Sequence, residues 1–188
     1  MVILSSTYFG PVQWYQKLCR HGHVAIERYD HFMKQTYRNR CVIAAANGPQ
    51  ALTVPVEKGE TQPLLMKDVR ISDHGNWRHQ HWTALMSSYG QSPFYEFYAD
   101  DFAPFYDRKW AFLADFNEDL LRLVCQLMDI EVSWQRTTSY SDRRDWYSPA
   151  DEPPKPYYQS FSSQHGFLPD LSCIDLLFNM GPESVFYL

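Results

Sequence analysis

The sequence lacks the charge pattern and the apolar runs of several common protein classes. Its 17 Lys and Arg residues are outnumbered by 22 Asp and Glu residues, so no overall basic field is present to neutralise phosphates. Nonspecific nucleic-acid binding is therefore disfavoured, with a local patch of arginines (Arg38, Arg40, Arg70 and Arg78) as the remaining alternative. No stretch approaches the roughly 18 apolar residues that indicate a membrane span, and MVILSSTYFGP has no positively charged start. We expect a soluble, cytoplasmic protein.

The sequence also lacks paired cysteines and the common catalytic motifs. Its four cysteines, Cys19, Cys41, Cys125 and Cys173, are widely spaced without a C-x-x-C pair, which favours buried reduced thiols over zinc ligands or disulfides. No G-x-S-x-G, Walker or G-x-G-x-x-G pattern is present. We therefore predict no cofactor and no bound metal.

What is present is enough apolar material for a folded domain. Apolar residues make up 45% and aromatic residues 16% of the 188 residues, which excludes a mostly disordered chain. We expect residues 1–188 to form a single domain, with an irregular proline-rich loop over 141–160.

The most informative stretch is YRNRCVIAAANGPQALTVPV, from Tyr37 to Val56. Two apolar runs, 41–46 and 51–56, flank Asn47-Gly48, a dipeptide that tolerates the positive φ angles of a two-residue hairpin turn. The sequence therefore predicts a β-hairpin here, entered through the polar pair Asn39-Arg40.

The other predicted elements indicate an α/β fold. A strand at 2–4, a helix over 12–19 and a strand at 24–26 form a β-α-β start, although the short connection leaves antiparallel pairing open. Farther along we expect a strand at 69–71, a helix from Asn76, a helix over about 108–128 capped by Asp107, a strand at 131–136 and a helix over 173–180 capped by Ser172. The predicted fold is a mixed β-sheet containing the hairpin, with helices packed on it.

The helix that begins near Trp77 carries the first candidate catalytic residue. Its predicted core-facing stripe contains Trp82, Leu85, Met86 and Tyr89, and His81 lies on a neighbouring, more polar face. Histidine has an ordinary pKa near 6.5, which suits proton transfer, so His81 is a candidate general acid or base. The alternative is a structural histidine hydrogen-bonded at the rim of the core.

Three histidines in this region, His74, His79 and His81, invite a metal interpretation that helix geometry opposes. His79 and His81 lie about 200° apart on a helix, and two turns separate His74 from His81. One ion cannot bridge such a gap at metal–nitrogen distances of about 2 Å.

Arg40 is the second candidate site residue. Its guanidinium can hold a carboxylate or phosphate with two hydrogen bonds, and Asn39 can add polar contacts; a surface ion pair is the alternative. Cys41 paired with His81 as a nucleophile also remains open, whereas Asp175 is expected to be a helix-cap or surface residue. Asn117 falls on the apolar stripe of its helix, where it either hydrogen-bonds internally or lines a pocket.

Several motifs together resemble the WbqC-like protein family. They are Tyr8-Phe9-Gly10-Pro11, TYRNRCVI at 36–43, LTVPV at 52–56, the Trp77 and His81 helix with Tyr89 and Pro93, and IDLLFNMGPE at 174–183. The 141–160 loop lies outside the resemblance.

The resemblance implies an enzyme of bacterial surface-polysaccharide (O-antigen type) biosynthesis. The implied activity is a transferase that moves an acyl or similar small group onto a nucleotide sugar or related metabolite. We expect Tyr8, Asn39, Arg40, Trp77 and His81 to converge on a pocket at the strand ends, with Arg40 binding the anionic part and His81 handling the proton. A noncatalytic binding protein is the alternative, and the oligomeric state is not predicted.

Overall fold

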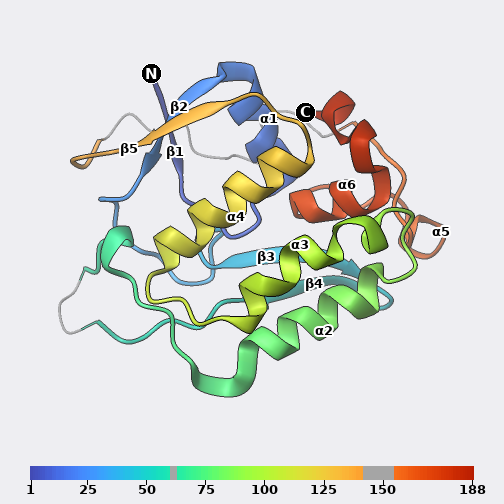
Figure 1. Cartoon of the computed structure of the whole chain (residues 1–188), viewed down its shortest axis with the longest axis horizontal. Coiled ribbons are helices and arrows are strands. Elements are labelled where there is room, and N and C mark those ends of the chain that lie inside the picture. The colour runs from blue at the N-terminus through green and yellow to red at the C-terminus, as the bar shows by residue number, and fades with distance from the viewer. Residues whose placement is uncertain (60–62, 142–154) are drawn as a thin grey trace.

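A computed structural model describes residues 1–59, 63–141 and 155–188, and it shows an α/β arrangement (Figure 1). Three strands, β1 (Val2–Ser5), β2 (His23–Glu27) and β5 (Ser133–Arg136), form a parallel sheet in the order β1-β2-β5. Helix α1 (Val12–His21) connects β1 to β2. The predicted β-α-β start is therefore confirmed, and its pairing is parallel.

The predicted hairpin is present as a separate two-stranded sheet. Strands β3 (Arg40–Ala45) and β4 (Gly48–Thr53) pair with each other, and the register joins Ala45 to Gly48. The turn is therefore Ala46-Asn47, one residue earlier than predicted. A turn at Asn47-Gly48 would require an N–H from Pro49 to close the hairpin, and proline has none.

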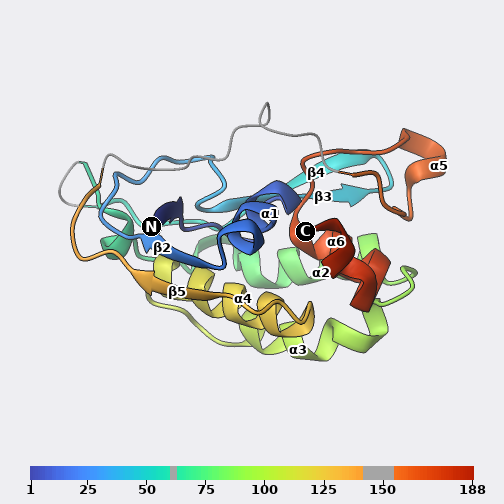
Figure 2. The same cartoon turned by 90° about the horizontal axis from the view of Figure 1, so that it is seen from above.

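Three helices lie on one side of the hairpin (Figure 2). They are α2 (Trp77–Tyr89), α3 (Tyr95–Asp107) and α4 (Leu113–Leu127), and α2 packs directly against β3. Two more helices follow β5: the short α5 (Ser162–His165) and α6 (Cys173–Met180), where the latter has the predicted bounds. Single 3₁₀ turns occupy 66–68 and 74–76, and a longer 3₁₀ segment ends the chain at 181–187.

The α4 prediction was wrong at its start. Asp107 ends α3 instead of capping α4, and residues 108–112 are not helical, with extended backbone at Arg108 and Phe112. Backbone hydrogen bonds hold this segment against 69–71, because Ile71 N donates to Ala111 O and Leu113 N donates to Val69 O. The predicted strand at 69–71 is accordingly present only as isolated bridges, to Phe112 and to Val56.

The predicted orientation of α2 also needs correction. Met86, predicted to face the core, is 50% exposed, whereas Trp77 and His81 are 3% and 5% exposed. The core side of α2 is thus centred on Trp77, His81, Leu85, Ser88 and Tyr89.

Asp175 at the start of α6 is buried, so it is not the surface residue that the sequence analysis allowed for. It is 0% exposed and accepts hydrogen bonds from the hydroxyls of Tyr89 (2.8 Å) and Tyr157 (2.7 Å). The Ser172 hydroxyl does accept from the Ile174 N–H, as the predicted cap requires. Tyr157 belongs to the predicted 141–160 loop, of which residues 142–154 lie outside the described residues.

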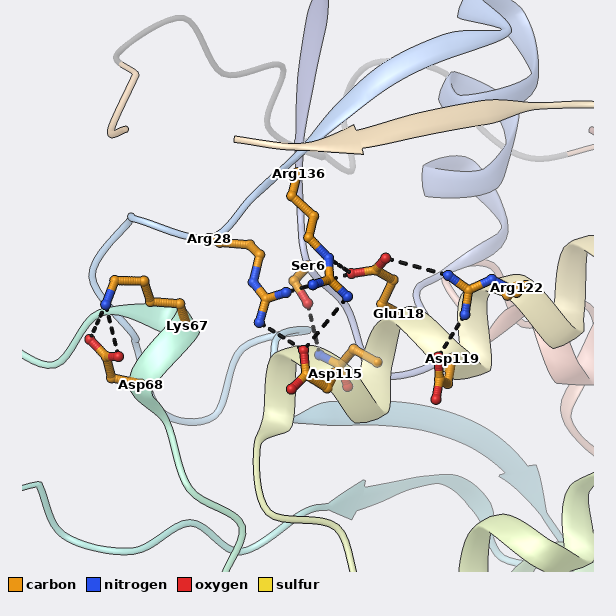
Figure 3. A network of polar contacts seen from close by, with 10 residues as sticks. Ser6, Arg28, Lys67, Asp68, Asp115, Glu118, Asp119, Arg122 and Arg136 are labelled. Atoms are coloured by element: carbon orange, nitrogen blue, oxygen red, sulfur yellow. Dashed lines mark hydrogen bonds and ion pairs between the residues drawn. The ribbon is translucent and has the colours of Figure 1, made fainter. Parts of the chain in front are cut away.

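An ion-pair network joins the carboxyl ends of β2 and β5 to α4 (Figure 3). Glu118, 7% exposed, accepts from Arg136 Nε at 2.8 Å, and its Oε2 lies 3.8 Å from Arg28 Nη1. Arg28 also pairs with Asp115 at 2.8 Å. Because these arginines are balanced by nearby carboxylates, the network stabilises the sheet against α4 and offers no excess positive charge to a ligand.

Candidate functional site

The segment that follows β1 brings the first family motif to the carboxyl end of the parallel sheet. Phe9 has a φ of 44°, in the left-handed region that a bulky residue rarely adopts, and its ring is 1% exposed. Gly10 follows, where an added Cβ would lie 2.7 Å from Thr7 Oγ1. Strained backbone of this kind is typical of functional segments.

A cavity of about 210 Å³ opens beside this segment. Its lining combines the hydroxyl residues Ser5, Thr7 and Thr36 with the side chains of Trp14, Met33, Tyr37 and Arg38. The Trp14 indole is fixed because its Nε1–H donates to Ser5 O at 3.1 Å. Ligands of parallel α/β sheets bind outside the carboxyl ends of the strands, so this cavity lies where a ligand is expected.

Tyr8 points the other way, into the core, and joins two helices. Its hydroxyl lies 2.9 Å from His81 Nδ1 and 2.8 Å from the Tyr106 hydroxyl. Tyr8 is 0% exposed, and the Trp77 ring meets the His81 ring edge-on at 5.1 Å. Tyr8, Trp77 and His81 therefore come together, with Tyr106 as a member that the sequence did not single out.

The His81 imidazole is neutral in this setting. Burial lowers its pKa from 6.5 to about 4, and a hydrogen bond to the Thr53 backbone acts in the opposite direction. The nitrogen that donates to the Thr53 carbonyl is Nε2, since Nδ1 faces Tyr8. Nδ1 then accepts from the Tyr8 hydroxyl, which in turn accepts from Tyr106. Burial also raises the pKa of Tyr8 well above its usual value.

Arg40, the first residue of β3, and Asn39 before it contact Thr53 at the end of β4 and Val54 after it. Arg40 Nε donates to Thr53 Oγ1 at 2.9 Å, and Asn39 Nδ2 donates to Val54 O at 3.0 Å. Arg40 is partly exposed, while Asn39 is 3% exposed. Contacts to Thr53 and Val54 thus link Asn39, Arg40 and His81 at the open end of the hairpin.

Arg38, which the sequence analysis named only as part of an arginine patch, and Asn117, which it singled out, are neighbours of the candidate site. Arg38 is buried and its guanidinium pairs with Asp30 Oδ2. Asn117 Nδ2 donates to Arg38 O at 2.8 Å and to Ser6 Oγ at 3.1 Å. The internal hydrogen bonds of Asn117 answer the open question about its place on the α4 stripe. The position of a polar residue on an apolar stripe singled out Asn117, whereas its contact with Arg38 joins residues far apart in the sequence.

The geometry does not favour the nucleophile and metal alternatives. Cys41 is 0% exposed, and burial raises the pKa of its thiol, so it remains protonated at neutral pH. Within residues 1–59, 63–141 and 155–188, no group of three or more His, Cys, Asp and Glu side chains is arranged to hold a metal ion. Over the same residues, no helix has the length and apolar character to cross a membrane.

Comparison with known proteins identifies one family. Residues 6–150 match the WbqC-like protein family, a range that includes the start of the 141–160 loop and does not reach the 174–183 motif. A protein of Mycobacterium tuberculosis described as "Uncharacterized protein Rv1507c" is 27% identical over 199 residues, which cover 84% of this chain and 83% of that protein. No solved structure matches. Because the match covers more than half of its residues, the chain belongs to the WbqC-like protein family.

Proposed function

We propose that this protein binds a small anionic metabolite at the open end of the hairpin and acts on it as a transferase. The bound metabolite is a nucleotide sugar or a related compound, and the reaction adds an acyl or similar small group to it for surface-polysaccharide biosynthesis. Arg40 binds the anionic part. The observation that supports this proposal best is the meeting of Arg40 and His81 at one residue, Thr53.

Arg40 suits an anion because its guanidinium is oriented and not neutralised. Its Nε is held by the Thr53 hydroxyl, and no carboxylate among the described residues pairs with it. The terminal nitrogens therefore remain able to donate two parallel hydrogen bonds to a phosphate or carboxylate. The cavity beside Ser5, Thr7 and Trp14 lies close to the backbone of Arg40. Thr36 lines this cavity, and its carbonyl oxygen accepts a hydrogen bond from Arg40 N.

In the proposed reaction the acceptor nitrogen or oxygen bonds to the acyl carbon as the bond to the donor's leaving group breaks. The acceptor loses one proton, which in the proposed step passes to the Tyr8 hydroxyl as that hydroxyl gives its own proton to Nδ1 of the neutral His81, because Nε2 already carries the proton that is donated to Thr53. The Tyr8 hydroxyl occupies Nδ1 and orients the ring.

The second candidate, a noncatalytic binding protein, is favoured by one observation. Both ring nitrogens of His81 are engaged by the protein and the side chain is 5% exposed. A buried histidine with a purely structural role is expected to have both ring nitrogens engaged in the same way.

Replacing Arg40 with alanine is expected to weaken binding of a sugar nucleotide about 10- to 100-fold, because charge-assisted hydrogen bonds contribute about 1.5–3 kcal/mol. The measurement is a thermal-shift titration with UDP-glucose, in which a ligand that binds only the native state raises the melting temperature. Arg70→Ala is the matched control, since Arg70 is exposed and lies over the Phe112 ring. Equal affinity in Arg40→Ala and wild type would contradict the binding role.

Replacing His81 with glutamine tests catalysis separately. Loss of a general base lowers turnover by about 100-fold or more, whereas glutamine can still accept from Tyr8 and donate to Thr53. The measurement is transfer of a labelled acetyl group from acetyl-coenzyme A to an amino-sugar nucleotide, alongside a melting curve. A folded His81→Gln protein with full turnover would remove the proton role and leave the anion site standing.

A further inference from the structure

A second cavity, larger than the one beside β1, lies at the far end of the hairpin. It is an open groove of about 900 Å³ between the hairpin tip and α2. Arg40 pairs with Thr53 at one end of the ladder and Ala45 with Gly48 at the other, so five residue steps, roughly 16 Å, separate the two ends. The groove is therefore distinct from the proposed anion site.

The polar side chains of this groove carry no charge, and they lie among small apolar residues such as Ala45, Ala51 and Ala84. Amides and hydroxyls come from both walls: Asn47 and Gln50 from the hairpin, and Gln80, Thr83 and Ser87 from α2. No Lys, Arg, Asp or Glu is among its described lining residues, and His79 is the one titratable side chain there. Such a surface offers no counter-charge to a phosphate or carboxylate, so it disfavours nucleotides and other anions.

The hairpin edge adds main-chain groups to the same groove. Pro49 has no N–H, so the Ala44–Pro49 pair is a non-hydrogen-bonded pair, and alternation makes Val42–Ala51 another. Two contacts agree with this: Ala44 N donates to the Tyr89 hydroxyl, and Val42 O accepts from Ser172 N. The N–H and C=O of Ala51 therefore point away from β3, on the edge that lines the groove.

The same register argues against a peptide as the occupant. An extended peptide that adds to a sheet edge needs a run of alternating main-chain donors and acceptors. Pro49 removes one donor from this short edge. A peptide added to β4 could therefore accept a main-chain hydrogen bond only from Ala51 N–H before it reached Thr53. Small residues in the lining of the groove (Ala45, Gly48 and Ala84) instead let a compact ligand approach the backbone.

We propose that the groove between the hairpin tip and α2 binds a neutral saccharide. Sugar hydroxyls both donate and accept hydrogen bonds, which matches side-chain amides, hydroxyls and a main-chain N–H and C=O without any charge. The volume lies within the range of small-molecule sites, about 300–1,000 Å³, and its open sides leave room for a chain of several sugar units. This inference does not depend on the transferase proposal.

The test is a two-dimensional ¹H–¹⁵N NMR titration of the full chain with maltotriose, cellotriose and N,N′,N″-triacetylchitotriose at millimolar concentration. At least one of these probes is expected to shift the amide signals of Asn47, Ala51 and Gln80. Gln50→Ala and Gln80→Ala should each weaken binding roughly 2- to 10-fold, the effect of losing one neutral hydrogen bond of about 0.5–1.5 kcal/mol. Both positions are exposed, so the fold is expected to tolerate them.

Gln126→Ala, an exposed glutamine on α4, is the matched control and should leave the titration unchanged. Three outcomes would overturn the inference. They are the absence of shifts with all three trisaccharides, shifts that both glutamine variants leave unchanged, and equal shifts of the same amides by UDP-glucuronic acid or by an extended hexapeptide. Loss of UDP-glucose binding in Arg40→Ala with intact trisaccharide binding would show the two sites to be independent.

Discussion

Replacing Phe116 with alanine is expected to lower the free energy of unfolding by about 3–5 kcal/mol, the usual cost of removing a buried phenyl ring. Phe116 is 0% exposed. Its ring contacts those of Tyr8, Trp77 and Trp110, with centroid distances of 5.6, 5.9 and 5.2 Å. The measurement is urea unfolding followed by tryptophan fluorescence and checked by circular dichroism.

The same substitution should also change the titration of His81. The cavity left by Phe116 lies beside Tyr8, so water gains access to the imidazole whose pKa burial lowers to about 4. In Phe116→Ala the His81 pKa is expected to rise toward the ordinary value of about 6.5, as measured by NMR of the imidazole carbon-bound protons. Phe97→Ala is the control: Phe97 is 75% exposed, so its loss should stay within about 0.5 kcal/mol. A comparable cost for both variants would contradict this account of the core.

Two buried titratable groups should make opposite contributions to stability between about pH 4 and pH 6.5. Burial lowers the pKa of His81 from 6.5 to about 4. Burial raises the pKa of Asp175 from 3.8 to about 6, although its hydrogen bonds from Tyr157 and Tyr89 act the other way. A shift of one pKa unit corresponds to about 1.4 kcal/mol. The titration of each group therefore changes the free energy of unfolding by about 3 kcal/mol between about pH 4 and pH 6.5.

The sign for His81 follows from proton uptake. In this window the unfolded chain protonates His81 while the folded chain keeps it neutral, so the unfolded state binds more protons and stability falls as pH falls from 6.5 to 4. For Asp175 the folded state keeps the proton up to about pH 6, while the unfolded state loses it near pH 3.8. Stability from Asp175 is therefore present at low pH and lost as pH rises from about 4 to 6.

Single substitutions should separate the two contributions. Relative to wild type, His81→Gln is expected to lose about 3 kcal/mol of stability as pH rises from 4 to 6.5, because only the Asp175 contribution remains. Asp175→Asn should show the opposite slope of similar size, because only His81 remains. The measurement is urea unfolding at half-unit pH steps, with the difference from wild type plotted against pH.

The double variant His81→Gln/Asp175→Asn is the control for these slopes. His81 lies in α2 near β4, and Asp175 lies in α6 against Tyr89 and Tyr157, so the two effects should add. The double variant should then follow the wild-type profile in shape. If both single variants also followed that shape, the buried carboxyl and imidazole would not titrate as described.

Local sequence signals were sufficient for several elements. Helix α6 carries its own boundaries, because Ser172 supplies the cap and Gly181 takes the positive φ of 54° at its end. The hairpin was located by its apolar runs, and Pro49 also carried the information that shifts its turn by one residue. The strand, turn and helix of the first 21 residues follow from Gly10-Pro11, where a proline precedes a helix start.

The convergence of the site residues was not readable from local patterns. Tyr8, Arg40 and His81 come from three separate elements, and periodicity alone placed His81 on a polar flank of α2. Burying an imidazole is costly unless both ring nitrogens find partners. Those partners, the Tyr8 hydroxyl and the Thr53 carbonyl, are distant in sequence, so only the folded chain could show that His81 belongs in the core.

The sequence by itself determined the family, the α/β class and the short elements whose caps and turns are encoded within a few residues. Tertiary structure decided the start of α4, the buried side of α2 and the burial of Asp175. In each of these cases a long-range hydrogen bond outweighed a local preference: 69–71 holds the non-helical segment before α4, and two tyrosines hold Asp175. Such bonds depend on which segments meet in space, and neither hydrophobic periodicity nor a capping motif contains that information.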